Sequence, residues 1–147
     1  MKKGFTLIEL LIVIAIISIL AVAIIPNFIG FDTEARVAAT KSNLDAVRTR
    51  ITFFRAKEGK YPESLGGLTS HFYLDAGVKK SYLKRLPKEM ISSKKGNSTF
   101  EDALSDEPLS GDGGWAYYKD AAEVVIDVST PLDKSWGDVE GEIPSKW

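Results

Sequence analysis

The chain has 147 residues with a formal net charge of −1, and it contains no cysteine and one histidine. The near-zero charge excludes a global attraction to polyanions, and the counts exclude both disulfides and a cysteine–histidine zinc site. His71 has no serine elbow beside it, and Gly111 to Gly114 lacks the lysine and helix of a phosphate loop, so an enzymatic role is not expected.

The N-terminus combines two lysines, a glycine and one acid with a long apolar run. From Phe5 to Ile25 the only charged residue is Glu9, and a helix of these 21 residues would be ~30 Å long, the thickness of a bilayer core. A carboxylate in such a run costs on the order of 2–3 kcal/mol in lipid, so Glu9 should have a partner. A cut between Gly4 and Phe5 would create an α-ammonium one helical turn away.

The sequence from Lys3 to Leu10 resembles the class III signal of type IV pilins and of type II secretion pseudopilins. The resemblance implies that a prepilin peptidase cuts after Gly4 and methylates Phe5, so residues 1–4 are a leader. It also implies that Glu9 pairs with the terminus of a neighbouring subunit during assembly, and that the subunit is stored in the inner membrane before an assembly platform inserts it.

Two other interpretations of this N-terminus remain open. Lys2 and Lys3 with the small-x-small run Ala21 to Ala23 fit a secretory signal peptide, although the apolar run continues to Ile25 and Glu9 interrupts it. A plain signal anchor is the second alternative, with Glu9 reaching toward the headgroups. All three interpretations place the N-terminus in the cytoplasm and export the remainder.

One helix over residues 5–58 is predicted, with its span over 5–25 and an amphipathic part over 26–58. Pro26 removes a backbone donor, so with Gly30 it should bend or open the helix. Gly59 suits the helix end. Helical spacing then predicts one apolar stripe on the second part, formed by Val37, Leu44, Val47, Ile51 and Phe54.

Residues 59–147 should form one globular region. A turn at Tyr61 to Leu68 is followed by a connecting loop from Thr69 to Ser110, with short helices expected over 78–83 and 100–104. Residues 115–119 and 123–128 are rich in β-formers and predict an antiparallel hairpin that covers the helix stripe, with Trp115 in the core. A third strand is expected near Leu86 or in the irregular acidic tail after Ser129. The fold class is therefore α+β and pilin-like, a long N-terminal helix packed on a small C-terminal antiparallel sheet.

Charge is unevenly distributed in the globular region. Between residues 71 and 100 seven Lys or Arg residues face two acids, whereas residues 101–147 hold twelve acids and three lysines. Patches of opposite sign suit head-to-tail contacts in a helical polymer, or they are ordinary solvated faces. DNA is a further candidate partner, because Lys79, Lys80, Lys84 and Arg85 lie near Tyr73 and Tyr82 in sequence.

Cofactors are not expected, with one exception that the resemblance suggests. Major pseudopilins commonly use calcium to order a C-terminal loop, and four aspartates lie in loop-like sequence without EF-hand spacing. These candidates are Asp106, Asp112, Asp133 and Asp138.

Three functional hypotheses follow. The leading one is a type IV pilin that polymerises through its hydrophobic helix into a surface fibre for adhesion, motility or DNA uptake. The alternative is a type II secretion pseudopilin in a short periplasmic fibre. The third is a membrane-anchored exported domain that never polymerises.

Overall fold

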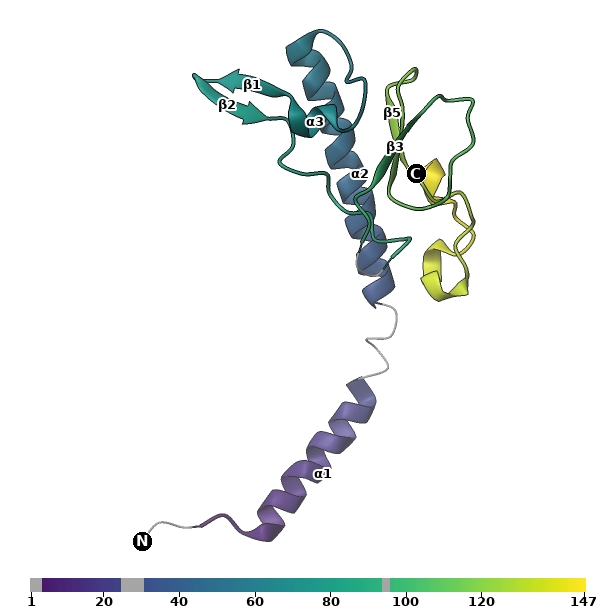
Figure 1. Cartoon of the computed structure of the whole chain (residues 1–147). Coiled ribbons are helices and arrows are strands. Elements are labelled where there is room, and N and C mark those ends of the chain that lie inside the picture. The colour runs from purple at the N-terminus through teal and green to yellow at the C-terminus, as the bar shows by residue number, and fades with distance from the viewer. Residues whose placement is uncertain (1–3, 25–30, 94–95) are drawn as a thin grey trace. The chain divides into compact units, whose positions relative to one another are not determined.

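The structure is a computed structural model that describes residues 4–24, 31–93 and 96–147. The chain divides into two compact units, Met1–Asp32 and Thr33–Trp147, which we describe separately. Helix α1, Leu7–Ile24, belongs to the first unit, and helix α2 spans Phe31–Glu58 (Figure 1). The predicted bend at Pro26 and Gly30 lies outside the described residues.

Helix α1 is apolar on all sides, and none of its residues is buried. Its one internal hydroxyl is satisfied within the helix, because Ser18 Oγ donates to the Ile14 carbonyl oxygen at 2.7 Å. Since the backbone and this hydroxyl are both satisfied internally, the helix can lie in hydrocarbon without an unmet polar group along its length.

Helix α2 presents one face to the globular core. All five stripe residues predicted from the sequence are buried: Val37, Leu44, Val47, Ile51 and Phe54. Arg55 and Lys57 in the last turn complement the negative end of the helix dipole. Gly59 takes a left-handed φ of 74° and donates to the Arg55 carbonyl at 2.9 Å, so the helix ends where the sequence predicts.

Residues 72–81 form a hairpin, so the predicted helix over 78–83 is wrong. Strands β1, Phe72–Asp75, and β2, Val78–Ser81, pair antiparallel with Asp75 opposite Val78. Ala76 and Gly77 both have positive φ, which is the geometry of a two-residue hairpin turn and is incompatible with a helix start. The short helix α3, Gly67–Ser70, precedes the hairpin at the turn predicted after Tyr61.

A three-stranded sheet has the order β3-β4-β5, with strands Phe100–Ala103, Trp115–Tyr118 and Glu123–Ile126. The predicted antiparallel hairpin is confirmed as β4 and β5. The third strand, however, is β3, which pairs parallel to β4. The short helix predicted over residues 100–104 is therefore wrong. A parallel neighbour needs a long crossover, and residues 104–114 provide it. Both predicted locations of the third strand are wrong, because Leu86 is buried outside any strand and the described residues 129–147 contain 3₁₀ helices but no strand.

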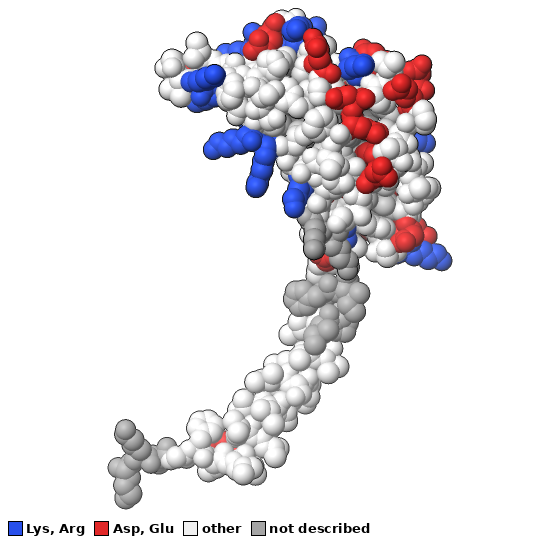
Figure 2. Space-filling view, in the orientation of Figure 1, with Lys and Arg blue, Asp and Glu red and all other residues white. Residues whose placement is uncertain are grey.

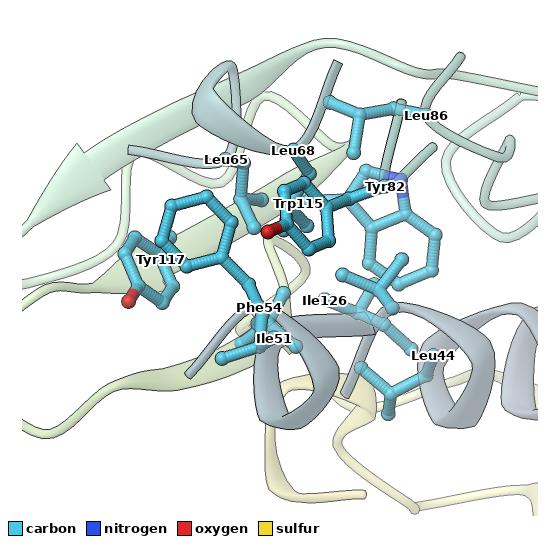
Figure 3. Packing of buried hydrophobic residues seen from close by; sticks show 12 residues of the cluster. Leu44, Ile51, Phe54, Leu65, Leu68, Tyr82, Leu86, Trp115, Tyr117 and Ile126 are labelled. Atoms are coloured by element: carbon cyan, nitrogen blue, oxygen red, sulfur yellow. The ribbon is translucent and has the colours of Figure 1, made fainter. Parts of the chain in front are cut away.

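The main core lies between α2 and the inner face of the β3-β4-β5 sheet (Figure 3). Trp115 and Tyr117 of β4 and Ile126 of β5 are fully buried against the α2 stripe, which confirms the predicted packing. Both aromatic polar groups are satisfied, because Trp115 Nε1 donates to the Pro87 oxygen at 2.9 Å and Tyr117 Oη to the Pro62 oxygen at 2.8 Å. These two bonds also fix the loops that connect α2 to the sheet.

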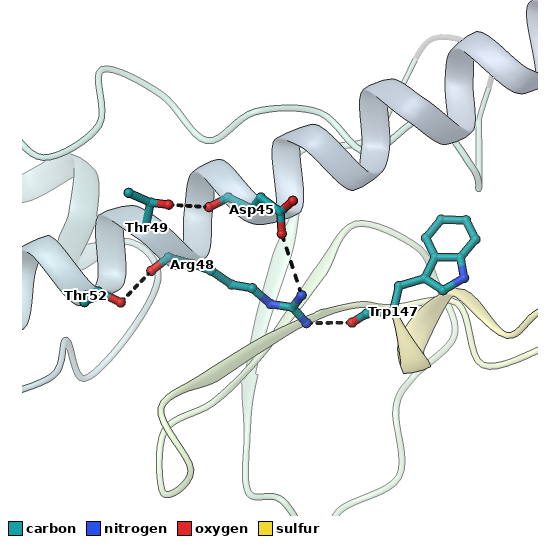
Figure 4. Close-up of polar contacts among 5 residues, drawn as sticks. All are labelled: Asp45, Arg48, Thr49, Thr52 and Trp147. Atoms are coloured by element: carbon teal, nitrogen blue, oxygen red, sulfur yellow. Dashed lines mark hydrogen bonds and ion pairs between the residues drawn. The ribbon is translucent and has the colours of Figure 1, made fainter.

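The C-terminal segment returns to α2 through two 3₁₀ helices, η2, Lys134–Val139, and η3, Pro144–Lys146. Leu132 joins Val37 and Ile91 in a second, smaller apolar cluster. Arg48 on α2 donates to the main-chain oxygen of Trp147 (Figure 4). The C-terminal tail predicted as irregular therefore contains only 3₁₀ segments, and it packs along α2.

Two buried charged residues are satisfied by backbone groups. The Glu89 carboxylate accepts hydrogen bonds from the amides of Ile91, Ser92 and Gly114, at 2.7, 3.1 and 3.2 Å. Arg36 Nε donates to the Met90 oxygen at 2.7 Å. Each charge thus orders the loop after Leu86 by direct contact with its backbone.

Candidate functional site

The N-terminal end of α1 is the candidate site, and Gly4 and Phe5 begin its described part. Phe5 is 80 % exposed. A Cβ at Gly4 would meet no atom within 4 Å, and the φ of Gly4 is not left-handed. Nothing in the described fold therefore requires a glycine at position 4, so its presence needs another explanation than packing.

Glu9 is held by a reciprocal capping arrangement with Thr6. The Thr6 amide and hydroxyl donate to Glu9 Oε2 at 2.8 and 2.7 Å, and the Glu9 amide approaches Thr6 Oγ1 at 3.3 Å. This is a capping box, in which a hydroxyl and an acid three residues later satisfy free amides of the first helical turn. The acid that the sequence leaves without a partner therefore has one inside its own helix before any cleavage.

Thr6 is the partner of Glu9 in this structure, and it was not predicted from the sequence. The signal was present, because a threonine three residues before a glutamate at the start of an apolar run is the sequence form of a capping box. We expected a positively charged partner for the lone acid. We did not consider a neutral hydrogen-bond donor such as the Thr6 hydroxyl.

The predicted pairing of Glu9 with a Phe5 ammonium is a separate arrangement. In the intact chain the Phe5 nitrogen is part of the Gly4–Phe5 peptide bond and carries no charge. The pairing needs the cut chain, so it stays a prediction. The capping box nevertheless fixes where the carboxylate lies, at the first turn of α1 beside the residue that would become the terminus.

Helix α1 is long and apolar enough to cross a membrane, by length and composition. Every residue in its 18-residue span is at least partly exposed within this chain. A helix that is apolar on all sides is suited to an apolar environment such as lipid.

The four candidate calcium aspartates do not all come together. Asp112 and Asp133 line one pocket of about 370 Å³, between the glycine-rich loop and the C-terminal segment. The Asp133 carboxylate also caps η2 by accepting from the Ser135 amide at 2.8 Å. Within the described ranges no three acidic, histidine or cysteine side chains converge as a metal site. Calcium binding stays a prediction, and Asp112 with Asp133 is the pair that the fold brings to one place.

The aromatic residues near the basic stretch belong mainly to the core. Tyr82 is 2 % exposed, and its ring packs against Phe54 and Tyr73 at centroid distances of 4.7 and 4.9 Å. A buried ring cannot stack on a nucleic-acid base. The exposed aromatic residue beside the lysines is Phe72, which was not among the residues predicted for such a role.

Residues 1–25 match a family model described as the prokaryotic N-terminal methylation motif. The chain is similar to the type IV major pilin protein PilA of Myxococcus xanthus, with 46 % identity over 62 residues, covering 42 % of this chain and 28 % of that protein. It is also similar to the type IV major pilin protein PilE1 of Neisseria gonorrhoeae, with 38 % identity over 64 residues, 44 % of this chain and 39 % of that protein.

A second group of relatives aligns over a longer part of the chain. The type II secretion system core protein G of Pseudomonas aeruginosa is 29 % identical over 93 residues, which cover 58 % of this chain and 66 % of that protein. The chain thus spans from about a quarter to two thirds of the length of these curated relatives. No solved structure matches it.

Proposed function

We propose that this chain, which carries the N-terminal methylation motif and the prepilin signal found in type IV pilins and type II secretion pseudopilins, is a structural subunit of a type IV pilus-like filament. The observation that carries the proposal is α1, an apolar helix without a buried residue whose one acid lies at its N-terminal turn. In lipid this helix stores the subunit, and in a bundle of identical helices it forms the filament core. The role is structural and non-enzymatic.

A pseudopilin of a type II secretion system is the alternative. The alignment with core protein G covers 58 % of this chain against 42 % for the Myxococcus pilin, although the pilin alignment has the higher identity. Both roles use the same helix and the same processing, and they differ in where the fibre ends, on the cell surface or in the periplasm.

Processing at Gly4 is the first step of the proposed pathway. A prepilin peptidase hydrolyses the Gly4–Phe5 bond with one water molecule. It then transfers a methyl group from a sulfonium methyl donor to the Phe5 nitrogen, which gives up a proton while the donor leaves as a thioether. The open surroundings of Gly4 support this role. No contact in the described fold requires a glycine at this position, whereas a narrow peptidase pocket that binds the backbone closely would require one. The precursor is anchored in the inner membrane through α1 with its N-terminus in the cytoplasm.

Glu9 then directs assembly. After the cut, a methylated ammonium at Phe5 carries a positive charge, and pairing of one subunit's Glu9 with a neighbour's Phe5 fixes the axial register of two helices. The capping bonds from Thr6 keep the carboxylate satisfied until that neighbour arrives.

The test compares two substitutions at Glu9 in the native host. Glu9→Gln keeps an acceptor for the Thr6 capping bonds but removes the charge, whereas Glu9→Ala removes both. We expect both variants to insert in the membrane and neither to yield filaments. Normal filaments from Glu9→Gln would overturn the pairing, and membrane insertion with no filaments even from the unsubstituted chain would favour a non-polymerising anchored domain.

Mass spectrometry of sheared filaments separates the two fibre types. Abundant chain that begins with N-methylated Phe5 in the sheared fraction indicates a surface pilus. The same cleaved peptide in the membrane, with none in the sheared fraction of secreting cells, indicates a pseudopilus.

A further inference from the structure

The β1–β2 hairpin exposes an apolar face that the chain itself does not cover. Its register places four side chains on one side, which we call the hairpin face: Phe72, Leu74, Lys79 and Ser81. Phe72 is 50 % and Leu74 72 % exposed, whereas Tyr73 on the opposite side packs against Phe53 of α2. Large apolar side chains gathered on a projecting hairpin mark a contact surface.

Cations surround this apolar centre. The Lys79 ammonium lies 4.4 Å from the centroid of the Phe72 ring. Lys84 and Arg85 lie three and four residues after the end of β2 and are exposed, and no ion pair joins either to a carboxylate in the part of the chain that the structure describes. Figure 2 shows cations on the hairpin and on the segment below it. The partner of this face should therefore combine an apolar centre with negative charge.

The same unit carries a surface of that kind, which we call the acidic face: Glu101, Leu104, Glu107, Asp120 and Glu123. Leu104 is 38 % exposed and lies beside two of these acids, because its amide donates to Glu107 at 2.9 Å and the next amide, of Ser105, donates to Asp120 at 3.0 Å. Lys119 is the only cation between residues 101 and 133. Acids gather over the β3-β4-β5 side of the molecule, as Figure 2 shows.

The two faces cannot meet within one chain. Figure 1 shows the β1–β2 hairpin on one side of α2 and the β3-β4-β5 sheet on the other. Complementary faces on opposite sides of one body make a heterologous contact, which repeats from copy to copy and generates a helical polymer. Copies joined through their N-terminal helices are also at high effective concentration, so a small contact contributes to assembly.

We propose that the hairpin face of one copy docks on the acidic face of a neighbouring copy in the filament. The inference rests on the proposed filament function and adds to it the contact between globular regions. The apolar centres of the two faces pack together while their rims of opposite charge fix the orientation. Charge on a rim acts mainly on specificity and association rate, so the contact should weaken at high salt.

Cysteine cross-linking tests the contact directly, because the chain has no native cysteine. Filaments of the Leu74→Cys, Leu104→Cys double variant should give a ladder of dimers, trimers and longer species on oxidation. Each single variant should stay monomeric or stop at the dimer. The matched control is Leu74→Cys with Ser129→Cys, which places the second thiol on an exposed residue outside the acidic face.

Charge reversal gives an independent readout. Lys79→Glu and Glu123→Lys should each lower the yield of sheared filaments at least about tenfold, and the double reversal should restore it to within about threefold. Lys134→Glu, at an exposed lysine outside the hairpin face, should leave the yield unchanged.

The outcomes separate this inference from the proposed function. Filaments that form normally in both single reversals, with no ladder from the double-cysteine variant, would overturn the contact and leave the filament function intact. Loss of duplex DNA binding to Lys79→Glu filaments, with unchanged yield and no ladder, would instead assign the hairpin face to nucleic acid. Absence of filaments from the unsubstituted chain would overturn the proposed function itself.

Discussion

The Arg48 guanidinium donates from Nη2 to the main-chain oxygen of Trp147 at 2.7 Å and thereby joins the middle of α2 to the C-terminal segment (Figure 4). A second connection lies beside it, because Lys41 Nζ lies over the Trp147 ring, 4.2 Å from its centroid, and 3.3 Å from Glu142 Oε2. Glu142 also accepts from Trp147 Nε1 at 2.6 Å. The C-terminal segment is thus held to α2 by polar and cation–π contacts together.

Arg48→Ala should release this segment. Loss of a charged hydrogen bond costs about 1.5–3 kcal/mol, so we expect a lower free energy of unfolding and faster amide exchange over residues 129–147, measured on the full chain in detergent. Asp45→Ala is the control, because its carboxylate is 4.0 Å from Arg48 and largely exposed, and such a pair contributes under about 1 kcal/mol. Equal effects of the two substitutions would contradict the role of the Trp147 contact.

Thr6→Val should weaken the first turn of α1. The substitution keeps the side-chain shape but removes the hydroxyl that bonds Glu9, and loss of such a cap costs about 1 kcal/mol. We expect faster amide exchange at the start of α1 in micelles, with Thr6→Ser restoring the unsubstituted rate. If Thr6→Val and Thr6→Ser exchange alike, the hydroxyl does not hold the carboxylate.

Trp115→Ala should destabilise the globular unit by about 3–5 kcal/mol, because it leaves a large cavity where α2 meets the sheet. Trp115→Phe keeps most of the apolar volume and loses the bond to the Pro87 oxygen, so it should cost clearly less. Chemical denaturation of the full chain in detergent measures both. A Phe variant as unstable as the Ala variant would show that the hydrogen bond outweighs the packing.

Gly114→Ala should disrupt the sheet more than Gly111→Ala does. Both glycines have positive φ, but a Cβ at Gly114 would lie 2.4 Å from the Thr99 oxygen, whereas at Gly111 the nearest atom is 3.8 Å away. Both substitutions place an alanine at a positive φ, so this backbone cost is common to the two variants. The difference between their stabilities therefore reports how closely Thr99, before β3, approaches Gly114, before β4. Thermal unfolding should show a larger fall in the midpoint for Gly114→Ala, and equal falls would exclude the steric cause.

The stability of the globular unit should fall at high pH through Tyr117. Burial, with a smaller contribution from the Asp102 carboxylate, raises the pKa of Tyr117 to about 12. The unfolded chain releases this proton near pH 10 and the folded chain does not, so the free energy of unfolding falls as the pH rises from about 10 to about 12. Tyr117→Phe should show a shallower fall, measured by denaturation across this pH range, and an unchanged slope would contradict the assignment.

The features that depend on local sequence pattern could be predicted from the residues alone. The apolar span, the lone acid at Glu9, the α2 stripe and the end of that helix at Gly59 follow from composition, helical spacing and the preference of glycine for positive φ. The β4–β5 hairpin also follows, because its strands alternate in register and are joined by a short turn. The capping box at Thr6 was equally local and could have been found.

The pairing of β3 with β4, in contrast, depends on contacts between segments far apart in the sequence. Residues 100–103 become a strand because the edge of β4 accepts them in parallel, a choice that no local propensity specifies. The β1–β2 hairpin is local by comparison: the left-handed backbone at Ala76 and Gly77 turns the lysine-rich residues 78–81 against β1, and the helix prediction missed this two-residue turn. Its register brings Phe72, Leu74 and Lys79 to one face, because side-chain direction in a hairpin depends on the register.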